Sequence, residues 1–221
     1  MNKTQIVNKT ISYVKRSLEK ESSGHDSGHD WWHIERVQKM AKYIARKEGG
    51  DLFVVELASL LHDIADWKFH GGNETMGPKL AKQWLKSLAV DKKTIENVCY
   101  IISNISFLGE RHRAKMKTLE GKIVQDADRL DALGAIGIAR CFVFSGYSEN
   151  PIYNPNVRPT KNKSVESYKK SNATAINHFY EKLLLLKNRM NTKTAKRIAE
   201  ERHQFMEEFL TRFFKEWRLK E

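Results

Sequence analysis

Three short stretches rich in histidine and aspartate, far apart in the sequence, place the strongest constraint on how this chain folds. The first runs from His29 to Arg36 and reads His-Asp-Trp-Trp-His-Ile-Glu-Arg, the second contains the adjacent pair His62 and Asp63, and the third contains Asp128. Each stretch is embedded in apolar residues at three- and four-residue steps, which is typical of a helix. Because one helical turn rarely supplies more than two metal ligands, a metal site would require these three segments to converge.

Apolar residues recur at helical spacing through almost every segment, which predicts an all-α fold. One predicted helix begins near His29 or Asp30, and in it His33 shares the apolar face and therefore points toward the core. Gly49 and Gly50 close this helix, and Asp51 can cap the next one. No strand-like alternation of useful length is present. Further helices are predicted over residues 7–18, 74–88, 91–103, 172–187 and 192–219, an apolar helical pattern over 119–144, and loops over 105–118 and 145–160.

The length and the cysteine content indicate a single intracellular domain. The chain has 221 residues, which fits one domain over 1–221, with a metal-site core at about 29–144 and C-terminal helices at about 164–219 that complete the fold. The N-terminal part contains no unbroken apolar run, so neither a signal peptide nor a membrane span is expected. Cys99 and Cys141 lie in apolar surroundings, which favours buried free thiols and a reducing cytoplasm.

The charge balance favours an anionic ligand. The chain has 39 basic and 27 acidic residues and a formal net charge of +12. Such a charge attracts nucleotides and nucleic acids alike by long-range steering. No RNA-binding signature or pure Lys/Arg block accompanies it, so a solvated basic surface that helps anionic substrates to approach is favoured over a nucleic-acid footprint.

Aromatic residues form a stripe along the last predicted helix. Phe205, Phe209, Phe213 and Trp217 step by four residues and therefore share one face. This stripe predicts either a contribution to the core or a face for a homodimer, rather than a ligand site.

The predicted metal ligands are His33, His62, Asp63 and Asp128. Two imidazoles and two carboxylates suit Mn²⁺, Fe²⁺, Co²⁺, Ni²⁺ or Zn²⁺. Cysteine is absent from the set, which makes a structural zinc site less favoured. Water and a substrate phosphate would fill the remaining coordination positions, so that the ion lowers the pKa of the water and polarises the phosphorus.

The ordered tetrad resembles the HD superfamily of metal-dependent phosphohydrolases, which is defined by His, then His-Asp, then Asp. The phrase Gly-His-Asp-Trp-Trp-His ending at His33 and the phrase Gln-Asp-Ala-Asp-Arg-Leu-Asp-Ala-Leu-Gly beginning at Gln125 are similar to the small bacterial YedJ/YpgQ-type subgroup. This similarity extends over nearly the whole chain. It implies a helical HD-domain fold, one bound divalent ion that is often manganese, and hydrolysis of phosphoanhydride or phosphoester bonds.

The same resemblance implies a nucleotide or another phosphorylated small molecule as substrate. The leading hypothesis is hydrolysis of a nucleoside triphosphate to the monophosphate and pyrophosphate through a metal-activated water. Dephosphorylation of nucleoside monophosphates is the alternative within the class. A catalytically silent metal-binding protein that regulates, binds nucleic acid or serves as a dimeric scaffold is the alternative outside it.

Two aspartates are candidates for the chemical step. Asp66 stands one helical turn after His62 and could orient or deprotonate the attacking water. A solvated carboxylate after a helix end is the competing interpretation. Asp63 is assigned to the chemistry as well as to the metal.

Other residues near the tetrad are candidates for substrate binding or support. Arg36 and His29 lie one turn after and one turn before His33, and Lys122 precedes Asp128. All three are candidate substrate contacts, with a salt bridge, a helix-terminal histidine and a surface lysine as the respective alternatives. Asp131, three residues after Asp128, is expected to support a ligand without binding the ion itself.

Overall fold

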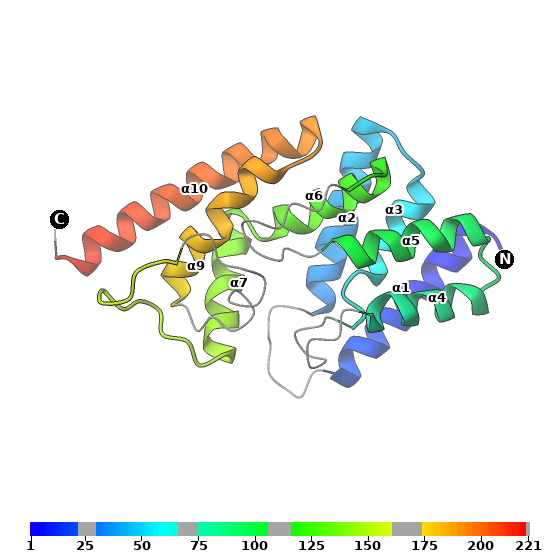
Figure 1. Ribbon diagram of the computed structural model, residues 1–221, viewed down its shortest axis with the longest axis horizontal. Helices are drawn as coiled ribbons and strands as arrows, with labels where there is room; N and C mark the ends of the chain where they lie inside the picture. Colours follow the sequence, from blue (N-terminus) through cyan, green and yellow to red (C-terminus); the bar gives the residue numbers. More distant parts are fainter. Residues whose placement is uncertain (22–29, 66–74, 106–115, 161–173, 220–221) are drawn as a thin grey trace. The chain divides into compact units, whose positions relative to one another are not determined.

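Helices make up the regular structure of the described chain (Figure 1). The structure is a computed structural model and describes residues 1–21, 30–65, 75–105, 116–160 and 174–219. No strand occurs within these ranges. The predicted all-α class is therefore confirmed.

The chain divides into two compact units, and the boundary falls inside one helix, between Asp128 and Arg129. Whether the two units act as the single domain that the sequence predicts stays a prediction. The first unit contains α1 (Lys3–Glu21), α2 (Trp31–Glu48), α3 (Leu52–Leu61), α4 (Met76–Ser87), α5 (Lys92–Asn104) and most of α6 (Leu119–Asp131). The second contains the last turn of α6, α7 (Gly134–Tyr147), α9 (Ala175–Glu181), the 3₁₀ helix η2 (Leu183–Arg189) and α10 (Lys193–Trp217).

Aspartate caps define where helices α2 and α3 of the first unit begin. The carboxylate of Asp30 accepts a hydrogen bond from the amide of His33, and that of Asp51 accepts one from Phe53, both at 2.9 Å. Each cap satisfies an amide that has no partner within its own helix. Gly49 has φ of 90°, which a side chain would disfavour, and its N–H donates to the carbonyl of Ala45. The predicted start near Asp30, the stop at Gly49 and the Asp51 cap are confirmed.

Helix α3 is the central helix of the first unit. It packs against α1, α2 and α5. All its residues from Phe53 to Leu61 are buried except Glu56, and Leu57, Leu60 and Leu61 have no exposed surface. A helix that is apolar on all sides is stable only inside a core. The residues that follow its last turn therefore emerge directly from the interior of the unit.

The apolar pattern over 119–144 is not one helix, because the chain breaks between α6 and α7. Gly134 has φ of 73°, a conformation that other residues rarely adopt. A Cβ atom on Gly137 would lie 2.3 Å from both the carbonyl carbon and the carbonyl oxygen of Ala132. These two glycines therefore permit the break, and their presence in the apolar pattern was the available sequence signal. The predicted loop at 145–160 begins later than expected, because α7 continues to Tyr147.

The helix predicted over 172–187 is also divided. Lys182, with φ of −140°, separates α9 from η2. In a 3₁₀ helix, residues three apart lie above one another, and Leu183 and Leu186 of η2 are both buried. The run of four leucines thus buries one edge through 3₁₀ rather than α-helical geometry.

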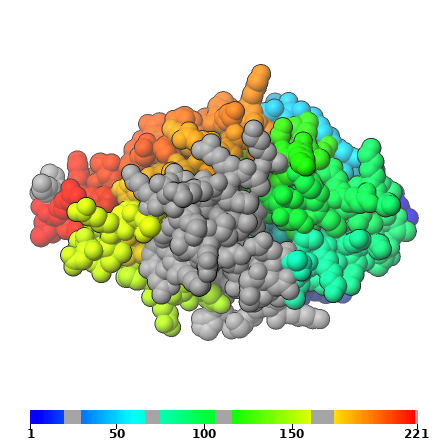
Figure 2. All heavy atoms as spheres, in the orientation of Figure 1, coloured from blue at the N-terminus to red at the C-terminus, as the bar shows by residue number. Residues whose placement is uncertain are grey.

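The aromatic stripe of α10 packs mainly within the second unit. The ring of Phe209 stacks on Phe179 at 5.8 Å between centroids, and Trp217 meets Tyr153 edge-on at 4.9 Å. Met206 and Leu210, which lie beside the stripe on the same helix, are buried. The prediction of a core role therefore holds only in part, because Phe209 packs on Phe179 but is half-buried and Phe205 is 48% exposed. The end of α10, coloured red, lies at the surface in Figure 2, and Trp217 itself is 51% exposed. The homodimer face stays a prediction.

Neither cysteine forms a disulfide. Cys141 is buried, as expected, whereas Cys99 is only half-buried. Burial raises the pKa of the Cys141 thiol to about 12, which keeps it protonated near neutral pH.

No single helix in the described ranges has both the length and the apolar content needed to cross a membrane. The consecutive helices α6 and α7 reach that length and composition only when they are counted together across the break between them.

Candidate metal centre

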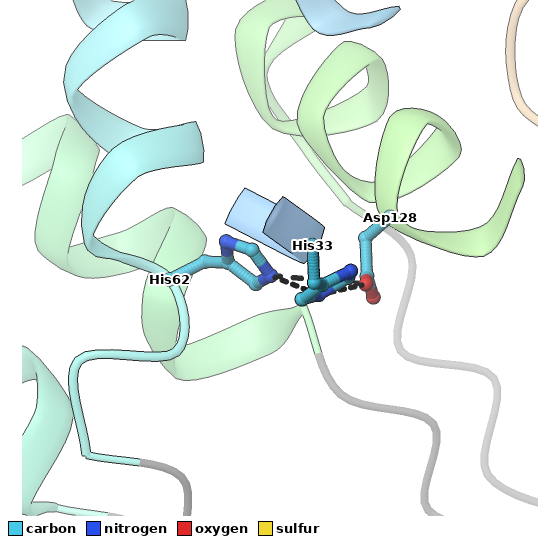
Figure 3. Close-up of side chains that lie close together, drawn as sticks. All are labelled: His33, His62 and Asp128. Carbon is cyan, nitrogen blue, oxygen red and sulfur yellow. Dashed lines mark hydrogen bonds and ion pairs between the residues drawn. The ribbon is translucent and has the colours of Figure 1, made fainter. Parts of the chain in front are cut away.

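The first turn of α2 delivers His33 to the centre. The cap by Asp30 fixes the backbone amide of His33, and the side chain of His33 has 1% of its surface exposed. Figure 3 shows its ring turned toward His62 and Asp128. The sequence-based expectation that His33 points inward is therefore confirmed.

His62 is the C-terminal cap residue of α3, and a backbone carbonyl fixes its ring on the side away from the centre. Its Nδ1 lies 2.8 Å from the carbonyl oxygen of Ser59, so Nδ1 carries a proton and donates it. Its Nε2 is left to face the centre. A carbonyl behind a ligating histidine fixes the ring and its tautomer. The sequence could not reveal this contact, because the acceptor is a backbone carbonyl, which any residue type at position 59 would provide.

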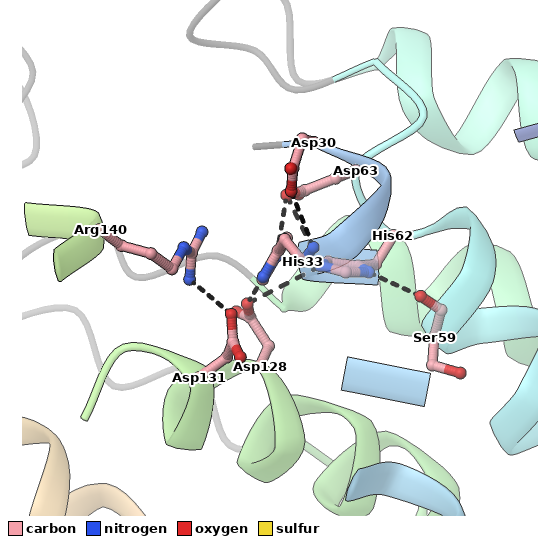
Figure 4. A network of polar contacts seen from close by, with 8 residues as sticks. All are labelled: Asp30, His33, Ser59, His62, Asp63, Asp128, Asp131 and Arg140. Atoms are coloured by element: carbon pink, nitrogen blue, oxygen red, sulfur yellow. Dashed lines mark hydrogen bonds and ion pairs between the residues drawn. The ribbon is translucent and has the colours of Figure 1, made fainter. Parts of the chain in front are cut away.

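Two carboxylates complete the cluster (Figure 4). The Nε2 of His33 lies 3.4 Å from Asp63 Oδ2 and 3.6 Å from Asp128 Oδ1. The corresponding distances from His62 Nε2 are 3.6 and 3.7 Å, and the two Nε2 atoms are 3.3 Å apart. The structure therefore brings the four predicted ligands together within the first unit.

The spacing of these donor atoms fits a divalent ion. Adjacent ligands at about 2.0–2.2 Å from a common ion lie about 2.8–3.6 Å apart in octahedral or tetrahedral arrangements, which is close to the distances between these atoms. The ligand atoms of His33, His62 and Asp128 all lie within 4.8 Å of one another, and Asp63, which is outside this group of three, lies 3.4 and 3.6 Å from the two histidine nitrogens. Two imidazole nitrogens facing each other at 3.3 Å need a proton or a cation between them. Two nitrogens and two carboxylate oxygens suit a first-row transition metal, although they do not select one.

The site is closed on its histidine side and more open on its carboxylate side. The side chains of His33 and His62 are each 1% exposed, whereas those of Asp63 and Asp128 are 16% and 30% exposed. Phosphate or water would therefore reach the cluster from the side of the aspartates.

The charges of the cluster shift the pKa of both His62 and Asp128. Burial opposes a charge on His62, but the carboxylates of Asp63 and Asp128 outweigh it and raise the pKa of His62 to about 9. Burial also opposes the negative charge of Asp128, but His62 outweighs it and lowers the pKa of Asp128 to about 2. At 3.7 Å, His62 and Asp128 interact through their charges rather than through a hydrogen bond. Without a metal, the site thus favours a proton on His62.

The other predicted site residues are less constrained. Asp66 and His29 lie outside the described residues, so their roles stay predictions. Arg36 is half-buried on α2, one turn after His33. Lys122 is half-buried on α6, six residues before Asp128, which corresponds to about 9 Å along the helix and a direction roughly 120° away. A shared contact of Lys122 and Asp128 with one phosphate would therefore require a long reach of the lysine.

Asp131 has a partner that sequence reasoning missed. One carboxylate oxygen of this buried residue accepts a hydrogen bond from Arg140 Nη1 at 3.0 Å (Figure 4). The arginine lies beyond the break between α6 and α7, so no helical spacing could have paired the two residues.

Comparison with known proteins identifies relatives over almost the whole chain. Residues 31–133 match the family model described as the HD domain. YpgQ of Bacillus subtilis is 40% identical over 206 residues, which cover 93% of this chain and 90% of YpgQ.

Solved structures of similar proteins cover the chain to the same extent. An HD-superfamily hydrolase from Bacillus thuringiensis is 44% identical with a TM-score of 0.75, covering 98% of this chain and 99% of its own. A protein of Lactobacillus plantarum is 36% identical with a TM-score of 0.87, covering 99% and 100%. B. subtilis YpgQ crystallised in complex with ADP has a TM-score of 0.76 at 35% identity, covering 98% and 97%.

Proposed function

The chain belongs to the HD superfamily, and from that membership we propose that it is a metal-dependent phosphohydrolase of nucleotides. The proposed reaction is hydrolysis of a nucleoside triphosphate to the monophosphate and pyrophosphate. The observation that carries the proposal is the convergence of His33, His62, Asp63 and Asp128. The two histidine Nε2 atoms lie 3.3 Å from each other and 3.4–3.7 Å from the carboxylate oxygens.

These four residues would hold one divalent ion, for which Mn²⁺ is the proposed identity and Co²⁺, Ni²⁺, Fe²⁺ and Zn²⁺ are alternatives. When bound, such an ion supplies Lewis-acid polarisation of a phosphate oxygen and lowers the pKa of a water molecule. The residues around the site contribute first by positioning the ligands. The Ser59 carbonyl holds His62 in the tautomer that presents Nε2, and burial of both imidazoles keeps bulk water from the nitrogen side.

The remaining proposed roles concern the substrate and the proton. Asp66 would orient the attacking water and accept its proton, because it follows His62 by about one helical turn. Arg36, His29 and Lys122 are proposed contacts for phosphate oxygens. The net charge of +12 would draw a polyphosphate toward the protein.

The relative that was crystallised with ADP supports a nucleotide as ligand. ADP combines a base, a sugar and a diphosphate, and the YpgQ structure matches this chain over 98% of its length with a TM-score of 0.76. We therefore propose a nucleotide rather than an unrelated phosphoester. The partial exposure of Asp63 and Asp128, beside the buried imidazoles, would let a phosphate group reach the proposed metal site and supports hydrolysis at the phosphate end.

Product analysis tests this function directly. Metal-free protein would be reconstituted with Mn²⁺, offered nucleoside mono- and triphosphates in turn, and assayed for monophosphate, pyrophosphate and orthophosphate. We expect monophosphate and pyrophosphate from triphosphates, and we expect Asp63→Ala to abolish both. Asp91→Asn, at an exposed helix cap of the same unit, is the matched carboxylate control and should retain full turnover.

Other outcomes of this experiment select other functions. Orthophosphate from monophosphates alone would identify a nucleotidase instead. A protein that binds stoichiometric metal and yet turns over no nucleotide with Mn²⁺, Co²⁺, Ni²⁺ or Zn²⁺ would contradict enzymatic function and support a regulatory or scaffold role.

A further inference from the structure

The helix that carries Asp128 ends only three residues later, at Asp131. The last carbonyl groups of an α-helix lack amide partners within the helix, and helix ends fray unless other groups hold them. Asp128 belongs to the first unit, whereas the turn that follows it belongs to the second. The position of the Asp128 carboxylate therefore depends on how well this last turn is held.

Arg140 holds this last turn through the side chain of Asp131. Arg140 of α7 donates to the carboxylate of Asp131 at 3.0 Å, and the two side chains are only 17% and 6% exposed. An ion pair with so little exposure is screened weakly by salt and keeps a defined geometry. Asp131 follows Asp128 by three residues, so both side chains project on the same side of α6.

Arg202 holds the same turn through a backbone carbonyl of the turn. The Nη1 group of Arg202, on α10, donates to the carbonyl oxygen of Leu130. The stem of Arg202 passes close to Gly134, where an added Cβ would lie 3.1 Å from its Cγ. The same carbonyl accepts a hydrogen bond from the Leu133 amide at 3.1 Å, so the guanidinium adds a second donor and places positive charge at the negative end of the helix dipole.

A third contact ties the same turn to η2. Arg129 donates through Nη1 to the carbonyl oxygen of Arg189, the last residue of η2. Three arginine contacts within the described part of the second unit thus converge on residues 129–131.

We propose that Arg202 and Arg140 are positioning residues for the metal centre. By holding the last turn of α6, they fix the Asp128 carboxylate at the distance at which it completes the ligand set. The C-terminal helix α10 then contributes to metal affinity although none of the four predicted ligands lies on it. This inference rests on the proposed role of Asp128 as a metal ligand.

The test is Mn²⁺ affinity, measured by equilibrium dialysis of the full-length metal-free protein well below its unfolding temperature. Arg202→Met keeps most of the stem beside Gly134 and removes the donor. We expect its Kd for Mn²⁺ to rise about tenfold, because groups that orient ligands typically contribute 10–100-fold to metal affinity. Arg202→Lys, which retains a cation near the carbonyl, should recover part of the loss.

Two control variants separate positioning from general destabilisation. Arg197→Met removes an exposed arginine from the same helix, where it pairs with Glu201, and should leave the Kd unchanged. Met206→Ala removes a buried side chain of α10 and should lower the Tm while the Kd for Mn²⁺ stays at the wild-type value. A Met206→Ala protein that loses as much Mn²⁺ affinity as Arg202→Met would overturn the proposal, as would wild-type affinity in Arg202→Met.

Further variants keep the inference testable on its own. If Arg202→Met does not fold, Arg140→Gln and Asp131→Asn interrupt the other contact with little change in shape and should raise the Kd in the same way. Unchanged affinity in both would overturn the proposal. Asp128→Asn should abolish tight binding. If it binds Mn²⁺ normally, the proposed metal site itself is wrong, whereas loss of binding in Asp128→Asn combined with normal binding in the arginine variants removes only the positioning role.

Discussion

His62 combines two opposing influences on its ring. Its nearly complete burial disfavours a positive charge, while Asp63 and Asp128 favour one, and the carboxylates prevail because they lie within 3.7 Å of its Nε2. The Ser59 carbonyl occupies Nδ1, so any proton gained or lost by the ring is exchanged at Nε2, the atom that faces the centre. A metal and this proton therefore compete for the same nitrogen.

Without metal, this histidine should make stability depend on pH. The pKa of His62 rises from 6.5 to about 9 on folding, so its contribution is fully present below pH 6.5 and is lost as pH rises through about 9. The loss should amount to about 3 kcal/mol, from 1.36 kcal/mol per pKa unit. Urea unfolding in the presence of a chelator at pH 6 and pH 9.5 measures it.

The matched variant is His62→Gln, which cannot titrate. The difference in unfolding free energy between wild type and His62→Gln should shrink between the two pH values. If the two proteins show the same pH dependence, the raised pKa of His62 is wrong.

The apolar pattern over residues 119–144 did not reveal the junction between helices α6 and α7. The chain needs a sharp change of direction directly after the turn that contains Asp131, and two glycines provide it by different means. Gly134 adopts a positive φ, whereas Gly137 lies against the carbonyl of Ala132, where any side chain would collide. Element boundaries at this junction are therefore set by sterics rather than by hydrophobicity.

Substitution of Gly137 should reveal this constraint. In Gly137→Ala, the added Cβ would lie 2.3 Å from the Ala132 backbone, so the backbone has to move. We expect a loss of unfolding free energy of about 2 kcal/mol, typical of overpacking. Gly146→Ala on the same helix is the matched control, because a Cβ there meets nothing within 4 Å. It should be neutral or stabilise by roughly 0.5 kcal/mol through helix propensity. Equal effects of the two substitutions in chemical denaturation would contradict the steric explanation.

At the scale of the whole molecule, the four predicted ligands come from three segments of one unit, and the last of them lies on the helix that both units share. An ion bound there would cross-link α2, the end of α3 and α6. Such a ligand binds the folded chain and not the unfolded one, and therefore couples metal binding to stability.

Metal removal should accordingly lower the melting temperature. At a free Mn²⁺ concentration of 100 times the Kd, binding should add about 2.7 kcal/mol to the free energy of unfolding. For a chain of this length, that corresponds to a rise in Tm of roughly 5–10 °C. Scanning calorimetry with Mn²⁺ and with excess chelator measures the shift, and Asp128→Asn should show none. An identical Tm in both conditions would count against the site.

The net charge of +12 should influence substrate capture rather than chemistry. Raising the salt concentration from about 0.05 to 0.5 M shortens the screening length several-fold. We expect kcat/KM for a nucleoside triphosphate to fall while kcat changes little. Steady-state kinetics at several salt concentrations checks this, with a neutral salt that does not bind the metal. A kcat/KM that is independent of salt would show that the basic surface does not steer the substrate.

Local patterns in the sequence were sufficient for the fold class, the start of α2 at its Asp30 cap, the cap at Asp51 and the inward direction of His33. Each of these depends on residues within a few positions of one another, where spacing and hydrogen-bonding groups act directly. The ordered His, His-Asp and Asp residues also identified the superfamily, because the motif resides in the side chains themselves and in their order along the chain.

Only the tertiary structure decided which groups meet. The Ser59 carbonyl behind His62, the Arg140 partner of Asp131 and the Arg202 contact with Leu130 join groups whose pairing has no local signature. Where the helix breaks depends on the positive φ of Gly134 and on the close approach of Gly137 to the Ala132 backbone, and the two glycines signal these contacts without defining them. The distances between the ligand atoms are also determined only by the tertiary structure, because they depend on how three separate helices pack. Periodicity encodes the direction of a side chain along its own helix, whereas long-range packing alone determines what that side chain touches.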